Sequence, residues 1–155
     1  MRSIVAVVAV LAIPTVMSAQ TPGQEAPVRR AVQAFYEVFN SAGFDRASDF
    51  TTEDWNHIRP LGGRTRGREA TVAQLQTVHR TFLKGVSETI EQMDVRFATA
   101  DVAVVTVTSH ASSFTTPDGV KRENPRQIRT FVVVTDTRLR TSCECQTATM
   151  SSSGQ

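Results

Sequence analysis

Apolar residues recur with a helical period in the first half of the chain and alternate with a period of two in the second half. A first helix is predicted to begin at Pro27, because proline is favoured in the first helical turn, and to end at residues 40–43. A short second helix is predicted from Asp45 to residue 50, and a third from Arg68 to Lys84. The apolar face of the first helix consists of Val28, Val32, Phe35 and Phe39.

The strands are predicted to follow the helices. Residues 55–60 read as a short strand and residues 61–67 as a loop. After Gly85 the alternation predicts four long strands, over residues 86–98, 101–115, 126–136 and 139–150. Helices first and an antiparallel meander afterwards predict an α+β domain with the helices on one face of a curved sheet.

The N-terminus has the layout of a secretory signal. Arg2 is followed by an unbroken apolar stretch at residues 4–13, then by Pro14 and small residues. That stretch is shorter than the roughly 20 residues a membrane-spanning helix needs. We predict a signal peptide over residues 1–18, and hence a secreted or periplasmic protein without stable membrane insertion. Cleavage after Ser18 is preferred over cleavage after Ala19, and an uncleaved anchor is the alternative.

The remaining chain is predicted to form one domain. Residues 19–26 read as a polar linker, residues 27–150 as the domain and residues 151–155 as a disordered tail. Cys143 and Cys145 are two apart in a predicted strand, so their side chains point the same way and a bridge between them would be strained. Two packed thiols, an intermolecular disulfide or a redox site remain open.

Charge and composition limit the classes of partner that the protein is expected to bind. The chain has 17 basic and 15 acidic residues, a net charge of +2, so it lacks the basic excess of a nucleic-acid-binding protein. With 40% hydrophobic and 21% charged residues, its composition is that of a globular protein.

The order of elements resembles that of the nuclear transport factor 2-like superfamily. The segment Thr52-Glu53-Asp54-Trp55-Asn56-His57-Ile58-Arg59-Pro60-Leu61-Gly62-Gly63, followed by Arg66-Gly67-Arg68-Glu69-Ala70, resembles its SnoaL-like branch. Asp101-Val102-Ala103-Val104-Val105 resembles the central strand of that branch. The resemblance implies a cone-shaped fold of three N-terminal helices packed on a curved, mainly antiparallel sheet. It implies no single activity, because this fold carries isomerases, cyclases, dehydratases and non-enzymatic modules.

Tyr36 is a candidate catalytic residue by resemblance. The segment Tyr36-Glu37-Val38-Phe39-Asn40-Ser41-Ala42-Gly43 is similar to the helix of ketosteroid isomerases that carries the oxyanion-hole tyrosine. In those enzymes an aspartate base precedes the segment that aligns with Pro60-Leu61-Gly62. Arg59 stands there in this chain, and a guanidinium stays protonated, so this type of isomerase chemistry is not expected.

His57 is the other candidate catalytic residue, as a general acid or base. Trp55, His57 and Arg59 alternate, so a regular strand would aim all three the same way, with Trp55 and Arg59 as ligand-binding residues. His79, on the apolar face of the third predicted helix, and His110, in the second long strand, are further candidate ligand-binding residues. A structural role is the alternative for each of these side chains.

No metal site and no cofactor are expected. No two histidines have a local ligand spacing, and the chain lacks a nucleophile elbow, a phosphate-binding loop and a dinucleotide fingerprint.

Two classes of function remain open. The first is an exported SnoaL-like protein whose pocket binds a small apolar molecule with a polar or acidic end, including a cyclase- or isomerase-type enzyme that uses His57. The second is a non-catalytic binding or assembly module. Whether the chain is an enzyme stays open. A homodimer is expected, because both faces of the strand at residues 101–115 are apolar or small.

Overall fold

The computed structural model describes residues 22–59, 63–135 and 141–150, the last as backbone only. The predicted signal peptide, residues 1–18, and the predicted tail, residues 151–155, lie outside the described residues. Among the helices of the described residues, none combines the length and the apolar character that a bilayer span requires.

The first helix, α1, runs from Pro22 to Ser41 and carries the predicted apolar face. It begins five residues before the predicted start, so residues 22–26 of the expected linker are helical. Pro27 is tolerated because it lies near the helix start, where few backbone bonds are lost. An ion pair between Glu25 and Arg29, one turn apart, supports these first turns.

The other two predicted helices are present but shorter or tighter. The element η1, Phe44–Asp49, is a 3-10 helix, and α2 spans Arg68–Arg80. Residues 81–85 form turns rather than a last helical turn, and Gly85 takes a positive φ of 74° that glycine adopts without strain. Three helices on one face of a sheet confirm the predicted fold class.

The main sheet has four antiparallel strands in the order β3-β4-β7-β8. Their bounds are β3, Glu88–Phe97; β4, Val102–Ala111; β7, Arg126–Thr135; and β8, Thr141–Met150. The register of β7 and β8 pairs Phe131 with Cys145 and Val133 with Cys143. The side chains of both cysteines lie outside the described residues.

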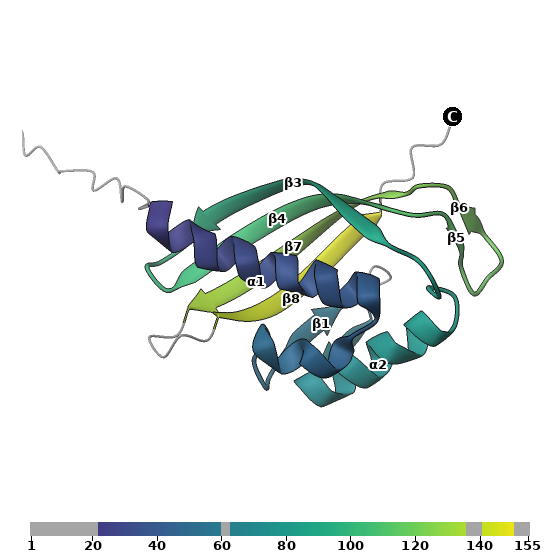
Figure 1. Ribbon diagram of the computed structural model, residues 1–155, viewed down its shortest axis with the longest axis horizontal. Helices are drawn as coiled ribbons and strands as arrows, with labels where there is room; N and C mark the ends of the chain where they lie inside the picture. The colour runs from purple at the N-terminus through teal and green to yellow at the C-terminus, as the bar shows by residue number, and fades with distance from the viewer. Residues whose placement is uncertain (1–21, 60–62, 136–140, 151–155) are drawn as a thin grey trace, which may run out of the picture.

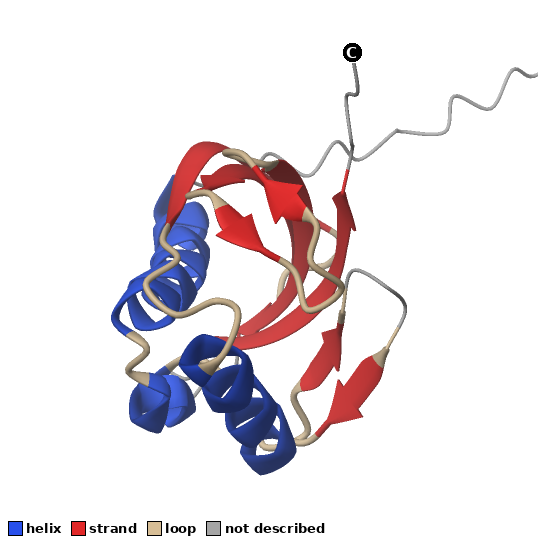
Figure 2. Cartoon of the chain, turned by 90° about the vertical axis from the view of Figure 1, so that its right-hand side faces the viewer, coloured by secondary structure: helices blue, strands red, loops and turns tan. Residues whose placement is uncertain are grey.

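Two short hairpins complete the fold. Residues 64–66, predicted as loop, form β2, Arg64–Arg66, which pairs with β1, Asn56–Ile58. A turn at residues 116–119 separates β5, Phe114–Thr115, from β6, Lys121–Arg122. Figure 1 shows α1 lying across the main sheet, with β1 and α2 below the C-terminal end of the helix. Figure 2 shows the strong curvature of the sheet, with the helices on one side of it.

The interior of the cone is apolar at one end and polar at the other. Burial alternates along β4 and β7, so every second side chain points inward. Ala103 and Val133, which face each other across the two strands, belong to the apolar core. Ser109, Gln127 and Arg129, at the other end of the same strands, are also buried. Polar groups buried at one end of a core have to be paired, and their pairing defines the candidate site.

Candidate functional site

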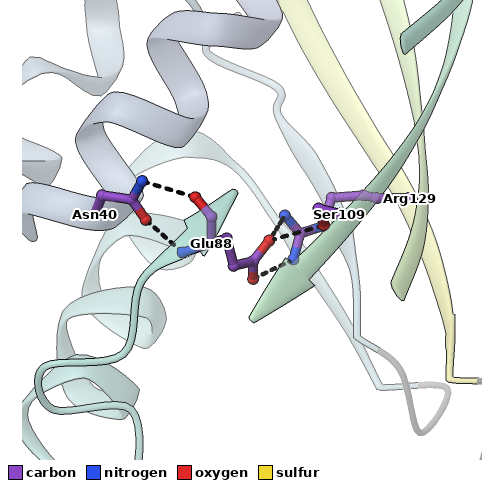
Figure 3. Close-up of polar contacts among 4 residues, drawn as sticks. All are labelled: Asn40, Glu88, Ser109 and Arg129. Carbon is purple, nitrogen blue, oxygen red and sulfur yellow. Dashed lines mark hydrogen bonds and ion pairs between the residues drawn. The ribbon is translucent and has the colours of Figure 1, made fainter. Parts of the chain in front are cut away.

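A buried ion pair occupies the polar end of the interior. The guanidinium of Arg129, on β7, donates from Nη1 to Glu88 Oε2 at 2.9 Å and from Nη2 to Glu88 Oε1 at 3.0 Å. The Glu88 side chain, at the start of β3, is 3% exposed, and that of Arg129 is 10% exposed. Two parallel bonds of this kind fix both side chains in orientation as well as in position (Figure 3).

Two further residues hold Glu88 in place. The Ser109 hydroxyl, on β4, donates to Glu88 Oε2 at 3.4 Å. Asn40, in the last turn of α1, donates from its side-chain amide to the Glu88 carbonyl at 2.9 Å and accepts from the Glu88 backbone N–H at 2.7 Å. Figure 3 shows Glu88 between Asn40 on one side and Arg129 and Ser109 on the other. The carboxylate is therefore positioned by three elements besides its own.

Aromatic rings of α1 cover the guanidinium. The central carbon of Arg129 lies 5.2 Å from the ring centre of Phe35, 5.5 Å from that of Tyr36 and 5.8 Å from that of Phe39. These distances are within the range of cation–π attraction, which strengthens when water is excluded. Tyr36, the candidate from the ketosteroid-isomerase resemblance, is itself buried and lies beside this cation.

His57 is buried on β1 and bonded to α2. Its Nδ1 lies 3.2 Å from Oε1 of Gln74. An amide oxygen only accepts, so Nδ1 carries the proton and Nε2 keeps the lone pair. Burial, the positive charge of Arg129 and, to a smaller extent, that of Arg59 lower the pKa of His57 to about 4, against the raising effect of the Gln74 bond. The imidazole is therefore neutral at neutral pH.

His79 lies on the buried face of α2, among aromatic rings. Its ring centre is 4.4 Å from that of Phe39 and 4.9 Å from that of Phe44, both in edge geometry. Burial lowers the pKa of His79, and the negative charge of Glu88 opposes that effect. Its Nε2 has no hydrogen-bond partner among the described residues. The two members of the ion pair therefore act on different histidines: the charge of Arg129 lowers the pKa of His57, and the charge of Glu88 raises that of His79.

Trp55 and Arg59 differ in placement, although the sequence put them on one face. The Trp55 side chain is fully buried, 6.3 Å from Phe35 and 6.1 Å from His57 between ring centres. Arg59 is exposed, because β1 ends at Ile58 and the alternation does not continue. The Arg59 guanidinium lies over Gly63, in the space that a Cβ at this position would occupy. Its charge still reaches His57.

His110 is on the opposite face of the sheet from the other candidates. Its side chain is half exposed, and Nε2 lies 3.1 Å from Oε2 of Glu91, which also pairs with Arg126. The structure therefore brings Tyr36, His57, Trp55 and His79 into the interior and leaves Arg59 and His110 at the surface.

The comparisons with known proteins agree with this architecture. The family model of the SnoaL-like domain matches residues 32–140. The chain belongs to the SnoaL-like domain family. Among curated proteins, the comparison found no match.

Solved structures with the same fold share little sequence with this SnoaL-like domain. One is an uncharacterized protein with a cystatin-like fold from Caulobacter vibrioides, with a TM-score of 0.78 and 18% identity over 84% of this chain and 92% of that one. A candidate dehydratase of the NTF2-like family from Streptomyces avermitilis gives 0.69 and 15%, over 84% and 99%. A candidate ketosteroid isomerase from Shewanella frigidimarina gives 0.63 and 16%, over 79% and 94%. At these identities the likeness concerns the fold alone.

Sequence reasoning missed the ion pair of this SnoaL-like domain. The strand that carries Arg129, residues 126–135, contains no carboxylate. The interior carboxylate comes instead from Glu88, the first residue of β3 and 41 residues away. The sequence does contain one signal for Arg129. It alternates with Phe131 and Val133, which places it on the inward face of β7.

Two surface cavities lie outside the polar interior of the SnoaL-like domain. One, of about 510 Å³, lies between η1 and α2, and the other, of about 600 Å³, lies beside the start of α1. None of the six candidate residues is among the described residues that line these cavities. Within that part of the chain, no three histidine, cysteine or acidic side chains are grouped as a metal site would require.

Proposed function

We propose that this SnoaL-like domain binds a small, mostly apolar molecule with a polar end inside its cone, and that His57 acts there as a proton acceptor. The observation that carries this proposal is the buried imidazole of His57, whose Nδ1 lies 3.2 Å from Gln74 Oε1 and whose pKa the charge of Arg129 helps to lower. A general base has to be unprotonated at the working pH, and burial together with the two arginine charges keeps His57 in that form.

The chemistry that suits this pair is proton removal next to a carbonyl group. Proton removal from such a carbon leaves negative charge on oxygen, and a fixed cation lowers the energy of that charge in a site from which water is excluded. Arg129 supplies a fixed cation, because Glu88 orients it and three rings cover it. Tyr36 lies in the same layer of the interior, where a phenol is a suitable further donor.

Buried polar atoms in the domain support a ligand with polar groups. Trp55 Nε1, Thr71 Oγ1 and His79 Nε2 are buried without hydrogen-bond partners among the described residues. A buried polar atom without a partner costs about 1–3 kcal/mol. A polar group on a bound molecule would recover part of that cost.

The test is a ligand screen read at Trp55, the single tryptophan of the chain. Small cyclic ketones and aromatic carbonyl compounds are added to the full chain, and the indole fluorescence and indole N–H signal are followed. We expect binders to change both signals, since the Trp55 ring lies within 6.1 Å of His57.

Turnover of any binder is then compared between two histidine variants. His57→Gln should abolish proton exchange at the carbon next to the carbonyl, and His110→Gln, on the opposite face, should leave it unchanged. Exchange at the parental rate in His57→Gln would remove His57 as the base. A panel in which no compound binds would end the proposal.

A second candidate function, a non-catalytic assembly module, is favoured by one observation. Ile128 and Val134, on the outer side of β7, are 43% and 39% exposed. Apolar side chains exposed on a sheet are typical of a surface that another protein covers. In that case the interior would be a structural core and the screen would yield no binder.

A further inference from the structure

A hydrogen bond between two elements fixes the ring of His57. Nδ1 of His57, at the centre of β1, lies 3.2 Å from Oε1 of Gln74, on α2. The two residues are 17 apart in sequence, so the bond forms only when the helix packs beside the strand. A neutral imidazole carries its proton on one of two nitrogens, and the hydrogen bond that a ring nitrogen makes selects between these forms. Because an amide oxygen only accepts, Gln74 selects the form with the proton on Nδ1.

The start of α2 is bonded to the chain that leads into β1, so the helix and the strand are held together. The Arg68 N–H donates to the Glu53 carbonyl at 2.8 Å, and the Gly67 N–H donates to the Trp55 carbonyl at 2.8 Å. The Arg68 guanidinium also donates from Nη2 to the Thr51 carbonyl at 2.7 Å. A side chain that orients a reactive group needs a rigid support of this kind.

The residue type at position 74 suits a base that has to stay neutral. A carboxylate beside Nδ1 would favour the charged imidazolium, whereas an amide accepts the same hydrogen bond without a negative charge. The charged groups that act on His57 are Arg129, on β7, and Arg59, after β1, and both lower its pKa. The Gln74 bond raises that pKa, but by less than burial and the charge of Arg129 lower it.

We propose that Gln74 is the positioning residue of the interior site, which holds the proton of His57 on Nδ1 and thereby makes the lone pair of Nε2 the base. This inference rests on the proposed function, in which His57 accepts a proton. When Nε2 takes a proton from the carbon next to a carbonyl group, the electron pair of the C–H bond stays with the substrate. Nδ1 keeps its proton and its bond to Gln74 throughout, so the ring does not have to turn.

The position of the proton is measured on the full chain without a ligand. Nitrogen chemical shifts of the imidazole distinguish a protonated ring nitrogen from one with a lone pair, and His57→Gln identifies the signals of His57. We expect Nδ1 to be protonated in the parent at neutral pH. Gln74→Leu removes the acceptor, so both forms should be present. Gln76→Leu is the control, because Gln76 is half-buried on the same helix but lines the cavity between η1 and α2.

Gln74→Glu gives a readout that a merely structural role would not move. It keeps an acceptor, so the proton should remain on Nδ1, but its negative charge should raise the pKa of His57 from about 4 toward the ordinary value of 6.5. With a compound identified by the carbonyl panel, Gln74→Leu should lower kcat for proton exchange by about 10- to 100-fold and leave KM unchanged, a loss typical of residues that orient a histidine. Gln76→Leu should keep the parental kcat.

The outcomes separate this inference from the proposed function. If the parent carries the proton of His57 on Nε2, or if Gln74→Leu keeps both the parental proton position and the parental kcat, Gln74 is not a positioning residue, while His57 can still be the base. If Gln74→Leu does not fold, an unchanged pKa of His57 in Gln74→Glu overturns the inference. If no compound of the panel binds, the proposed function ends and the inference ends with it.

Discussion

His57 and His79 are kept uncharged by their surroundings, so acidification should destabilise the domain. The pKa of His57 is lowered from 6.5 to about 4, and that of His79 is lowered as well. Below pH 6.5 the unfolded chain takes up a proton that the folded chain resists until about pH 4. The free energy of unfolding should therefore fall as the pH drops through this window, by about 3 kcal/mol for His57 alone, since one pKa unit is about 1.4 kcal/mol.

Urea denaturation at a series of pH values measures this effect. His57→Gln should flatten the dependence between pH 6.5 and 4.5, and His110→Gln, half exposed on the other face, should not. Carboxylates held in ion pairs act at lower pH, because the pKa of Glu91, for example, is lowered from 4.5. A parental slope in His57→Gln would contradict the assignment of His57 as a buried neutral group.

The Glu88–Arg129 pair predicts an asymmetry between single and double substitutions. Arg129→Gln leaves the carboxylate of Glu88 buried without its counterion, and a loss of that kind costs about 3–5 kcal/mol. Adding Glu88→Gln removes the stranded charge, so the double variant should be more stable than Arg129→Gln. Chemical denaturation of the four members of the cycle tests this. Additive losses would show that the two side chains do not interact.

At the scale of the elements, Asn40 joins the end of α1 to the start of β3. Its amide makes two hydrogen bonds to the backbone of Glu88. Asn40→Ala removes both, and at about 1 kcal/mol for each bond we expect a loss of about 2 kcal/mol in the free energy of unfolding. Gln33→Ala, at an exposed position on the same helix, is the matched control. Equal stability of the two variants would mean that the two hydrogen bonds between Asn40 and Glu88 contribute nothing to the free energy of unfolding.

The elements that could be predicted are those with a clear period. The apolar face of α1 and the alternation of β3, β4 and β7 are long enough to identify from the sequence, and the structure confirms them. The strand β2 was missed because it has three residues, two of them arginines, and exists only through its pairing with β1. The predicted start of α1 at Pro27 is too late, because the helix begins at Pro22 and accommodates Pro27 near its start.

The site was predictable only in part, for a related reason. Resemblance selected Tyr36, the alternation of residues 55–59 selected His57, and helical spacing put His79 on an apolar face; all three are buried. The sequence did not indicate which face of β4 carries His110, because both faces have apolar or small residues. In the structure, His110 is half exposed on the outer face. The partnership of Glu88 with Arg129 spans 41 residues of sequence, and no local pattern encodes which strands become neighbours.

At the scale of the whole molecule, the outer face of the sheet predicts a homodimer. Ile128 and Val134 are exposed there, and Val132 between them is half-buried. Ile128→Lys should shift the protein to a monomer in light scattering. Val120→Lys is the control, because Val120 is equally exposed, at 43%, but precedes β6, which belongs to a separate two-stranded sheet. A parental protein that is monomeric at high micromolar concentration would remove the dimer.

The N-terminal pattern predicts export, which stays a prediction because residues 1–18 lie outside the described part of the chain. Mass spectrometry of the protein from the extracytoplasmic fraction should find Ala19 or Gln20 at the N-terminus. Full-length chain recovered from the cytoplasm would contradict the signal peptide.

The hydrogen bonds of Glu88 also determine at which stage of folding the site forms. Its partners Ser109, Arg129 and Asn40 are separated from it by 21, 41 and 48 residues in sequence. Contacts over such separations form late, since the intervening chain has to lose its freedom first. The interior polar cluster is therefore assembled only after α1, β3, β4 and β7 have all docked. Occupancy by a ligand would consequently report that the entire chain has folded, rather than that one segment has.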